Sequence, residues 1–295
     1  MTQIELDTLN SLPAAEFVAA LGNVFEHAPW IAEAVAPRRP FATIKVLFAT
    51  MREVVASAGE EQRMALIKGH PDLADRTQRA AGLTADSTAE QGSVGLDGLT
   101  EAEYDAFTRV NTSYRQKFGF PYIVCVRRHT KDSILRDFER RLPNDRAAEI
   151  AGSIDEICRI AALRLDQLVA GPGRLAVTGR LSTHVLDTHG GAPAEGIAIE
   201  LRELCALGPP RLIARARTNA DGRTDQPLIH ARPLPIGRYE LTFHTGAYFA
   251  GRGVAQNDPP FLDDIPIRFA IDAPEGHFHV PLLVTPWSYS TYRGS

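Results

Sequence analysis

Cysteine is scarce in this chain of 295 residues, and long apolar runs and a strong excess of charge are missing. The three cysteines, Cys125, Cys158 and Cys205, are odd in number and widely spaced, which favours a reducing compartment over a disulfide framework. The net charge of -4 gives no electrostatic reason to expect a nucleic-acid partner or an anionic membrane. No stretch approaches the roughly 18 apolar residues of a spanning helix, and the first residues lack the order of a secretory signal. We therefore expect a soluble cytoplasmic protein.

Residues 1–170 have the apolar spacing of α-helices. One early stripe consists of Phe17, Leu21, Val24 and Phe25. Thr100 and Glu103 have the spacing of a capping box. A later helix, for which Asn144 could be the N-cap, has an apolar stripe at Ile150, Ile154, Ile157, Ala161, Leu165 and Leu168. The pattern predicts an all-α domain over residues 1–170.

The period changes after a short linker at residues 171–176, which begins Gly171-Pro172-Gly173. Val177, Leu181 and Val185 then alternate with polar residues, as in a half-buried strand. Further alternating runs are predicted at 197–204, 212–218, 239–245, 265–271 and 278–285, separated by turn signals. Several short strands at this spacing indicate a β-sandwich over residues 177–295. The fold class is therefore multidomain α and β.

Histidines lie away from the expected core on two of these strands. His184 is on the polar side of the first strand, and His277 and His279 alternate with the core residues of HFHVPLL. The simplest interpretation is that these histidines are solvated. A metal is a second interpretation, because His-x-His places two imidazoles on one side of a strand, but no third ligand is evident nearby. Arg223, after Asp221-Gly222, is by itself only an exposed turn arginine.

The β half resembles the 5-hydroxyisourate hydrolases, a transthyretin-like family. The matching segments are LSTHVLDTHGGAPAEGIAIEL (181–201), TNADGRT (218–224), YELTFHTGAYF (239–249), IPIRFAI (265–271) and HFHVPLLVTPWSYSTYRGS (277–295). The resemblance implies hydrolysis of a cyclic ureide without a metal or cofactor. It places the catalytic histidines at His184 and His279 and the catalytic arginine at Arg223. It also implies that Tyr292 contacts substrate and that Ser295 helps to relay protons.

Which of His184 and His279 is the general base stays open at this point. Both would activate and orient water, and Arg223 would stabilise the developing negative charge. The competing class is a binding protein, because transthyretin itself shares the fold, carries a hormone and is not a hydrolase. Transthyretin lacks the histidine–arginine set and the YRGS end that are present here, which favours the enzyme.

The helical half carries weaker local signals. His70 precedes Pro71 in GHPDLA, where a histidine is more often a loop or cap residue than a catalyst. Ser87 and Glu90 in STAEQ could form a plain capping box. The segment KFGFPYIVCVR (117–127) has the composition of a buried apolar stretch after a helix.

Three segments together, KGHPDLA (68–74), STAEQGSVGL (87–96) and NTSYRQKFGFPYIVCVR (111–127), resemble the 2-oxo-4-hydroxy-4-carboxy-5-ureidoimidazoline (OHCU) decarboxylases. This all-helical family needs no cofactor. The resemblance implies that His70 is the proton donor and that Glu90 holds the substrate and keeps His70 protonated. Its implied substrate contacts are Pro71, Ser87, Gln91, main-chain groups around Ile123 and Cys125, and Arg127. Arg127 could equally be a surface ion-pair partner.

The two resemblances concern consecutive reactions, because the hydrolase product is the decarboxylase substrate. They imply a bifunctional enzyme that converts 5-hydroxyisourate through OHCU to (S)-allantoin and CO₂. The alternative is that one half is catalytic and the other is a scaffold or a transthyretin-like binding module. The implied partners are these small-molecule substrates and further copies of the chain. We expect a tetramer through the C-terminal domain and dimer contacts through the N-terminal domain.

Overall fold

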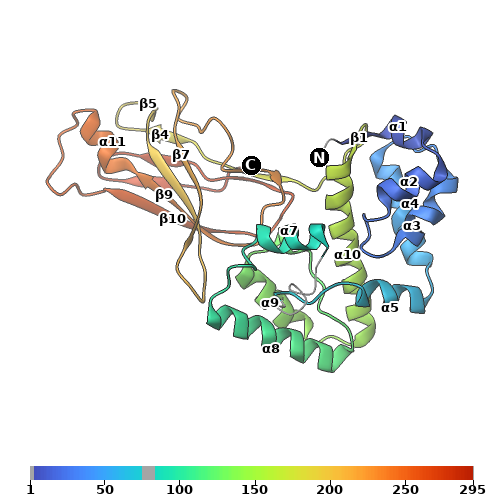
Figure 1. The fold of residues 1–295 in the computed structure, drawn as a ribbon. Coiled ribbons are helices and arrows are strands. Elements are labelled where there is room, and N and C mark those ends of the chain that lie inside the picture. The colour runs from blue at the N-terminus through green and yellow to red at the C-terminus, as the bar shows by residue number, and fades with distance from the viewer. Residues whose placement is uncertain (1–2, 75–83, 295) are drawn as a thin grey trace. The chain divides into compact units, whose positions relative to one another are not determined.

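The computed structural model describes residues 3–74 and 84–294, which form two compact units. The first unit comprises Met1–Arg127 and Ile134–Val177, and the second comprises Arg128–Ser133 and Thr178–Ser295. The first is helical and the second is built mainly from strands (Figure 1). The predicted fold class, helical and then β-rich, is confirmed. In the described ranges, no helix has both the length and the hydropathy needed to cross a membrane.

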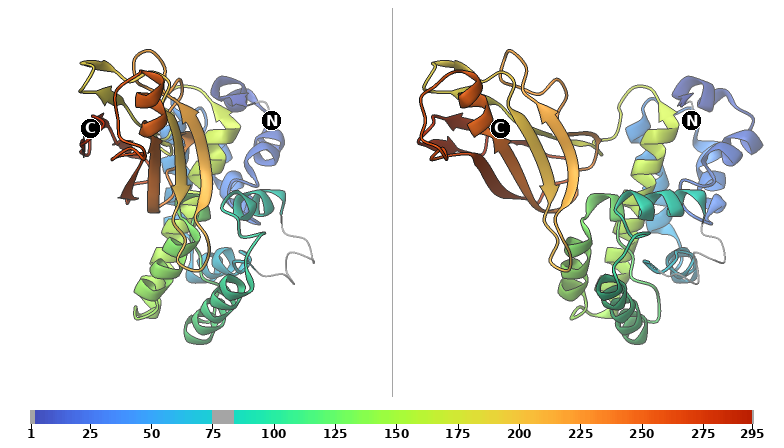
Figure 2. Two further views of the ribbon diagram at one scale, coloured as in Figure 1. Left: turned by 90° about the vertical axis from the view of Figure 1, so that its left-hand side faces the viewer. Right: turned by 60° about the vertical axis from the view of Figure 1, so that its left-hand side comes forward.

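The N-terminal half consists of helices joined by short turns. Those described are α1 (Leu6–Ser11), α2 (Ala14–Leu21), α3 (Pro29–Val35), α4 (Ile44–Ser57), α5 (Glu60–Lys68), α7 (Ala85–Ser93), α8 (Glu101–Phe118), α9 (Lys131–Arg141) and α10 (Arg146–Leu168), with the 3-10 turns η1 (Ala36–Arg38) and η2 (Val126–Arg128). The long helix α10 can be followed in all views of Figures 1 and 2. Its central residues Ile157, Ala161 and Leu165 are buried in the core, as the stripe predicts.

Side-chain caps fix where several helices begin. The capping box at α8 is confirmed, since Thr100 and Glu103 each accept a hydrogen bond from the other's backbone N–H. The predicted cap of α10 at Asn144 is wrong. Asp145 caps this helix by accepting the Ala148 N–H at 2.8 Å. The Asn144 amide instead donates to Glu149 at 2.7 Å.

The segment after α10 is attached to the helical unit. A short parallel pair joins β1 (Ile4–Glu5) to β2 (Val169–Ala170). Beyond it, the Pro172 and Gly173 carbonyls accept N–H groups from the first residues of α4, at 3.0 and 3.2 Å. A Cβ at Gly173, where φ is +68°, would lie 2.7 Å from the Thr43 Cβ. Glycine is required here because the backbone is left-handed and the approach is close.

The second unit has the strands of a sandwich. They are β3 (Gly179–Ser182), β4 (Val185–Asp187), β5 (Ala192–Pro193), β6 (Ala198–Glu203), β7 (Arg211–Arg217), β8 (Ile229–Arg232), β9 (Gly237–His244), β10 (Asp264–Ile271), β11 (His277–His279), β12 (Leu282–Val284) and β13 (Tyr289–Thr291), with helix α11 (Thr245–Gly251) after β9. One sheet has the order β10-β9-β6-β7, and the others are β11-β3-β8 and β13-β12-β4-β5. Side chains from all three form one apolar core.

The predicted first strand is interrupted at Thr183 and His184, between β3 and β4. The Thr183 hydroxyl is buried there and donates to the Val280 carbonyl at 2.7 Å. The two pieces pair in parallel with the two pieces of the other histidine strand, β3 with β11 and β4 with β12. This register brings the two histidine-bearing segments side by side.

Candidate active sites

A cavity in the helical unit contains most of the decarboxylase residues implied by the resemblance. Its lining comes from the α2–α3 turn, the residues after α5, α7, the segment after α8, and α10. The lining residues are Glu26, His70, Pro71, Leu73, Ser87, Glu90, Gln91, Tyr122, Ile123, Val124, Val126 and Ile160. The space between these atoms is about 380 Å³, including the open mouth. The three segments that resemble the decarboxylases are distant in the sequence and meet in this pocket, where apolar walls surround a few polar groups.

His70 has one ring nitrogen fixed and the other available in this cavity. Its Nδ1–H donates to the Leu66 carbonyl at 2.9 Å. Among the described residues, the buried Nε2 has no hydrogen-bond partner. Burial lowers the pKa of His70, although the Leu66 carbonyl and the Glu26 charge act in the opposite direction. The imidazole of the empty pocket is therefore mostly neutral at neutral pH, with its Nε2 lone pair available to a ligand or a proton.

A buried arginine joins two carboxylates beside His70. Arg164 of α10 makes a two-pronged contact with Glu90, with both N···O distances 2.9 Å, and its Nη2 lies 3.3 Å from Glu26. Burial acts to raise the pKa of Glu26, but hydrogen bonds from Thr84 and Ser87 and the charge of Arg164 hold it below its ordinary value. Glu26 can thus remain ionised beside this guanidinium.

Neither Glu26 nor Arg164 was among the residues implied from the sequence. Glu26 is bonded to Ser87 and Arg164, which lie 61 and 138 positions away along the chain, so no local spacing identifies this group. The local signal is that Arg164 interrupts the apolar run at 160–165 of α10, where a buried charge requires a partner.

Ser87 is not the N-cap of α7. Thr84 occupies that position and accepts the Ser87 N–H at 3.2 Å, so the capping-box alternative for Ser87 is wrong. Ser87, Glu90 and Gln91 instead share one face of the helix and line the cavity. The Ala74 N–H donates to the Gln91 amide oxygen at 3.2 Å, which orients the amide.

Helix α8 secures the loop that follows His70. Arg115 donates to both oxygens of Asp72, at 2.7 and 3.0 Å, and the Asn111 amide donates to the Leu73 carbonyl at 2.7 Å. These contacts account for Asn111 and Arg115 in the third matching segment. Their effect on the pocket is indirect, because they position Pro71 and Leu73.

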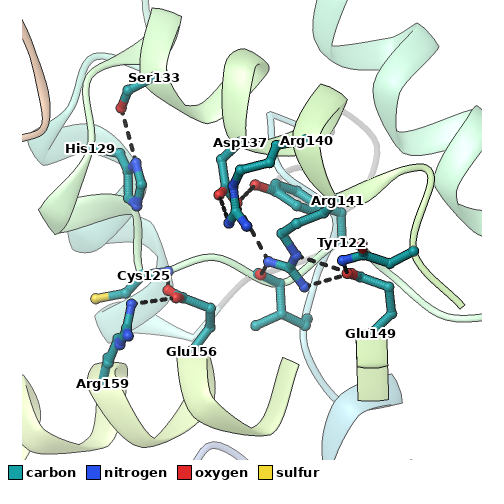
Figure 3. Close-up of polar contacts among 12 residues, drawn as sticks. Tyr122, Cys125, His129, Ser133, Asp137, Arg140, Arg141, Glu149, Glu156 and Arg159 are labelled. Carbon is teal, nitrogen blue, oxygen red and sulfur yellow. Dashed lines mark hydrogen bonds and ion pairs between the residues drawn. The ribbon is translucent and has the colours of Figure 1, made fainter. Parts of the chain in front are cut away.

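The buried segment Phe120–Val126 contributes Tyr122, Ile123, Val124 and Val126 to the lining, and a polar network is bonded to it (Figure 3). Arg141 donates to the Ile123 carbonyl at 2.7 Å and pairs with Glu149 at 2.8 Å. Glu156 accepts the Cys125 N–H at 2.8 Å. Ile123 lines the cavity, whereas Cys125 and Arg127 are not part of its lining. The Ile123 carbonyl and the Cys125 N–H are therefore already hydrogen-bonded to Arg141 and Glu156.

In the β unit, the structure brings His184, Arg223 and His279 together. Residues His184 and Arg223 pair in an isolated antiparallel bridge. Burial and then the Arg223 charge lower the pKa of His184, while the Asp221 backbone carbonyl acts to raise it. Within the described part of the chain, His184 Nε2 is buried without a hydrogen-bond partner. Burial, Arg223 and the other two histidines lower the pKa of His279.

Ser182 lies between the two histidines of the His-x-His segment. Its Oγ is 3.0 Å from His277 Nε2 and 3.0 Å from His279 Nδ1. The hydroxyl therefore orients both rings. Over residues 3–74 and 84–294, no group of three or more His, Cys, Asp or Glu has an arrangement suited to a metal ion.

The C-terminal segment passes directly beside His279. The Gly294 N–H donates to the His279 carbonyl at 2.9 Å, and a Cβ at Gly294 would lie 2.7 Å from the imidazole. Tyr292 is 59% exposed, so its side chain is free to meet a ligand or another subunit. Ser295 lies outside the described residues. The close approach of Gly294 to the His279 imidazole explains why glycine occupies the third position of YRGS.

Gly222→Ala should weaken both the β unit and its site. Gly222 has a φ of +70°, and a Cβ there would lie 2.3 Å from the Val185 carbonyl oxygen, next to His184. The left-handed backbone alone costs about 1–2 kcal/mol for alanine, and the overlap adds to this. Thermal unfolding and hydroxyisourate hydrolysis would measure the loss. Gly191→Ala is the matched control, because its φ of +69° is similar but its Cβ would meet nothing within 4 Å. Equal melting temperatures for the two variants would contradict the prediction.

The two units each contain a histidine site, so the chain has the organisation of a two-domain protein. The OHCU decarboxylase family model matches residues 10–166, and the HIUase/Transthyretin family model matches residues 181–294. The chain therefore belongs to the OHCU decarboxylase family through its helical half and to the HIUase/transthyretin family through its β half.

Individual relatives match each half and the whole. The 2-oxo-4-hydroxy-4-carboxy-5-ureidoimidazoline decarboxylase of Haloferax volcanii is 38% identical over 56% of this chain and 96% of its own length. The 5-hydroxyisourate hydrolase of Deinococcus radiodurans is 54% identical over 39% of this chain and 95% of its own length. A crystal structure of (S)-allantoin synthase is 36% identical, covers 99% of this chain and 100% of its own, and has a TM-score of 0.52.

Proposed function

We propose that this chain converts 5-hydroxyisourate to (S)-allantoin in two steps, hydrolysis in the β unit and decarboxylation in the helical unit. The observation that carries the proposal is the match of two different family models to the two halves of one chain. The (S)-allantoin synthase similarity over almost the full length of both chains supports the same pairing.

In the hydrolase site, a water attacks a ring carbonyl of 5-hydroxyisourate. His184 takes the water proton at Nε2 and passes it to the leaving ring nitrogen, so the C–N bond breaks as the carboxylate of OHCU forms. Arg223 and His279 stabilise the oxyanion, and Tyr292 contacts the substrate. Ser295 assists the proton transfers. The buried Nε2 of His184, which has no hydrogen-bond partner among the described residues, supports its assignment as the base.

In the decarboxylase site, loss of CO₂ leaves an electron pair that is delocalised into the adjacent C=N and C=O groups. His70 delivers a proton from Nε2 to one face of that carbon, which fixes the chirality of the product. The substrate carboxylate adds a negative charge beside His70 and favours its protonation. Glu90, Ser87 and Gln91 hold the polar groups of the substrate, with Pro71 and Ile123 forming the walls. Cys125 and Arg127 lie outside the lining and influence the bound substrate only from there.

The active form is a cytoplasmic homo-oligomer, a tetramer through the β unit with dimer contacts through the helical unit. Exposed aromatic side chains of the C-terminal segment support an interface there: Trp287 is 54%, Tyr289 46% and Tyr292 59% exposed.

The purified chain should accelerate the loss of 5-hydroxyisourate absorbance and then produce the circular dichroism signal of (S)-allantoin. Both intermediates also decay without a catalyst, so the uncatalysed mixture is the control. If the chain accelerates only the first step, the helical half is a scaffold. If it accelerates neither step, the proposal fails.

A further inference from the structure

The hydroxyl proton of Ser87 is committed to Glu26. The Ser87 Oγ lies 2.7 and 2.8 Å from the two carboxylate oxygens of Glu26. An ionised carboxylate can only accept hydrogen bonds, so the Ser87 hydroxyl must be the donor. Glu26 is 4% exposed, and Thr84 and Arg164 also donate to it. Ser87 can therefore offer only oxygen lone pairs to a ligand.

Among Glu26, Glu90 and Arg164, the negative charges around the cavity outnumber the positive ones. Glu26 and Glu90 carry two negative charges, and Arg164 between them carries one positive charge. The charged groups that act on His70 are Glu26, Arg164 and His27, and Glu90 lines the same cavity. Of these, only Glu26 appears as a carboxylate acting directly on His70, and it favours the protonated imidazole. Glu90 is instead held by both of its oxygens on Arg164.

We propose that Glu26 is a positioning residue of the decarboxylase site, which fixes Ser87 as a hydrogen-bond acceptor for substrate N–H groups and supports the protonated form of His70. This inference rests on the proposed decarboxylase function. The anionic substrate brings a further negative charge, so substrate binding is accompanied by uptake of one proton at His70 Nε2. That proton is then transferred to carbon as CO₂ leaves, and the charge of the pocket returns to its starting value.

Glu26→Gln tests the charge while keeping the shape of the side chain. Without the carboxylate, the pKa of His70 falls, so its protonated fraction at neutral pH decreases. We expect kcat for OHCU decarboxylation to fall about ten-fold at neutral pH for a shift of one unit and to recover as the pH is lowered. We also expect KM to rise, because the glutamine NH₂ can donate to Ser87 and disturb its acceptor role. Glu26→Asp, which keeps the charge but shortens the reach to Ser87, should raise KM with little change in the pH midpoint.

Glu149→Gln in the full-length chain is the matched control. Glu149 is a carboxylate that is 1% exposed and paired with Arg141 at 2.8 Å, and it does not line the cavity. It should lower the melting temperature without moving the pH midpoint of kcat. If Glu26→Gln loses rate equally at every pH, or if Glu149→Gln moves the midpoint as far, the inference is overturned. A wild-type chain that does not decarboxylate OHCU would instead overturn the proposed function.

Discussion

His70→Ala should hydrolyse 5-hydroxyisourate at the wild-type rate but should no longer accelerate formation of (S)-allantoin. Deleting a general acid typically costs about 10²- to 10⁴-fold in rate, and here the uncatalysed decay of OHCU then dominates. That decay has no preferred face, so the allantoin should be racemic. The expectation follows from the geometry of His70, which lines the cavity: its Nδ1 is anchored on Leu66, and its buried Nε2 has no hydrogen-bond partner among the described residues.

Circular dichroism measures this loss directly, while ultraviolet absorbance follows the first step in the same cuvette. His230→Ala, at an exposed histidine of β8, is the control for removing an imidazole elsewhere. A His70→Ala enzyme that still makes one enantiomer at the normal rate would remove His70 from the proton-donor role. In that case the chirality of the product would have to be set by another group in the pocket.

His184→Ala should have the converse effect, with a loss of about 10²- to 10⁴-fold in hydrolysis if His184 is the base and normal decarboxylation when OHCU is supplied. The pH profile gives a second test. Because the pKa values of His184 and His279 both lie below the ordinary histidine value, their neutral forms persist on the acid side of that value. Hydrolysis that needs neutral His184 should therefore stay constant through neutral pH and decline only in more acidic solution.

Arg223→Gln separates the two contributions of the arginine. It removes the charge that lowers the pKa of His184, so the acid limb should move to higher pH. It also removes oxyanion stabilisation, so kcat should fall at every pH. If His184→Ala retains the wild-type rate, or if Arg223→Gln leaves the acid limb in place, this assignment of roles is wrong.

Local periodicity predicts much of this architecture. The stripe of α10 and the alternation around His184 are set by neighbours in the chain. In the stripe, Ile157, Ala161 and Leu165 are buried, whereas its other members are partly buried, and Leu181 and Val185 are buried as the alternation predicts. The interruption at Thr183 was not predictable in this way, because it depends on a bond to Val280, 97 positions away. The error at Asn144 has a local origin, since Asn144 and Asp145 are adjacent and either residue type can cap a helix. Asp145 caps α10, and the Asn144 amide donates to Glu149, five positions away.

In both sites, too, some features follow from the local sequence and others depend on tertiary contacts. Histidines off the core of a strand can be identified from the alternation. Their meeting with each other depends on parallel pairing of distant segments, and the meeting of His184 with Arg223 depends on an isolated antiparallel bridge. In the helical unit, resemblance supplied His70, Ser87 and Glu90. The charge balance of that pocket remained hidden, because Glu26 is joined to its partners only by the tertiary fold.

The attachment of Pro172 and Gly173 to α4 determines how the two activities could be separated by molecular cloning. A fragment that stops at the end of α10 would lose β2, the two hydrogen bonds to α4, and the pairing of Arg174 with Asp166 at 2.8 Å. A helical fragment ending at Val177 retains all of these and would be the sounder choice for gene dissection. Mixing such a fragment with its β counterpart would then compare a fused catalyst with two freely diffusing ones.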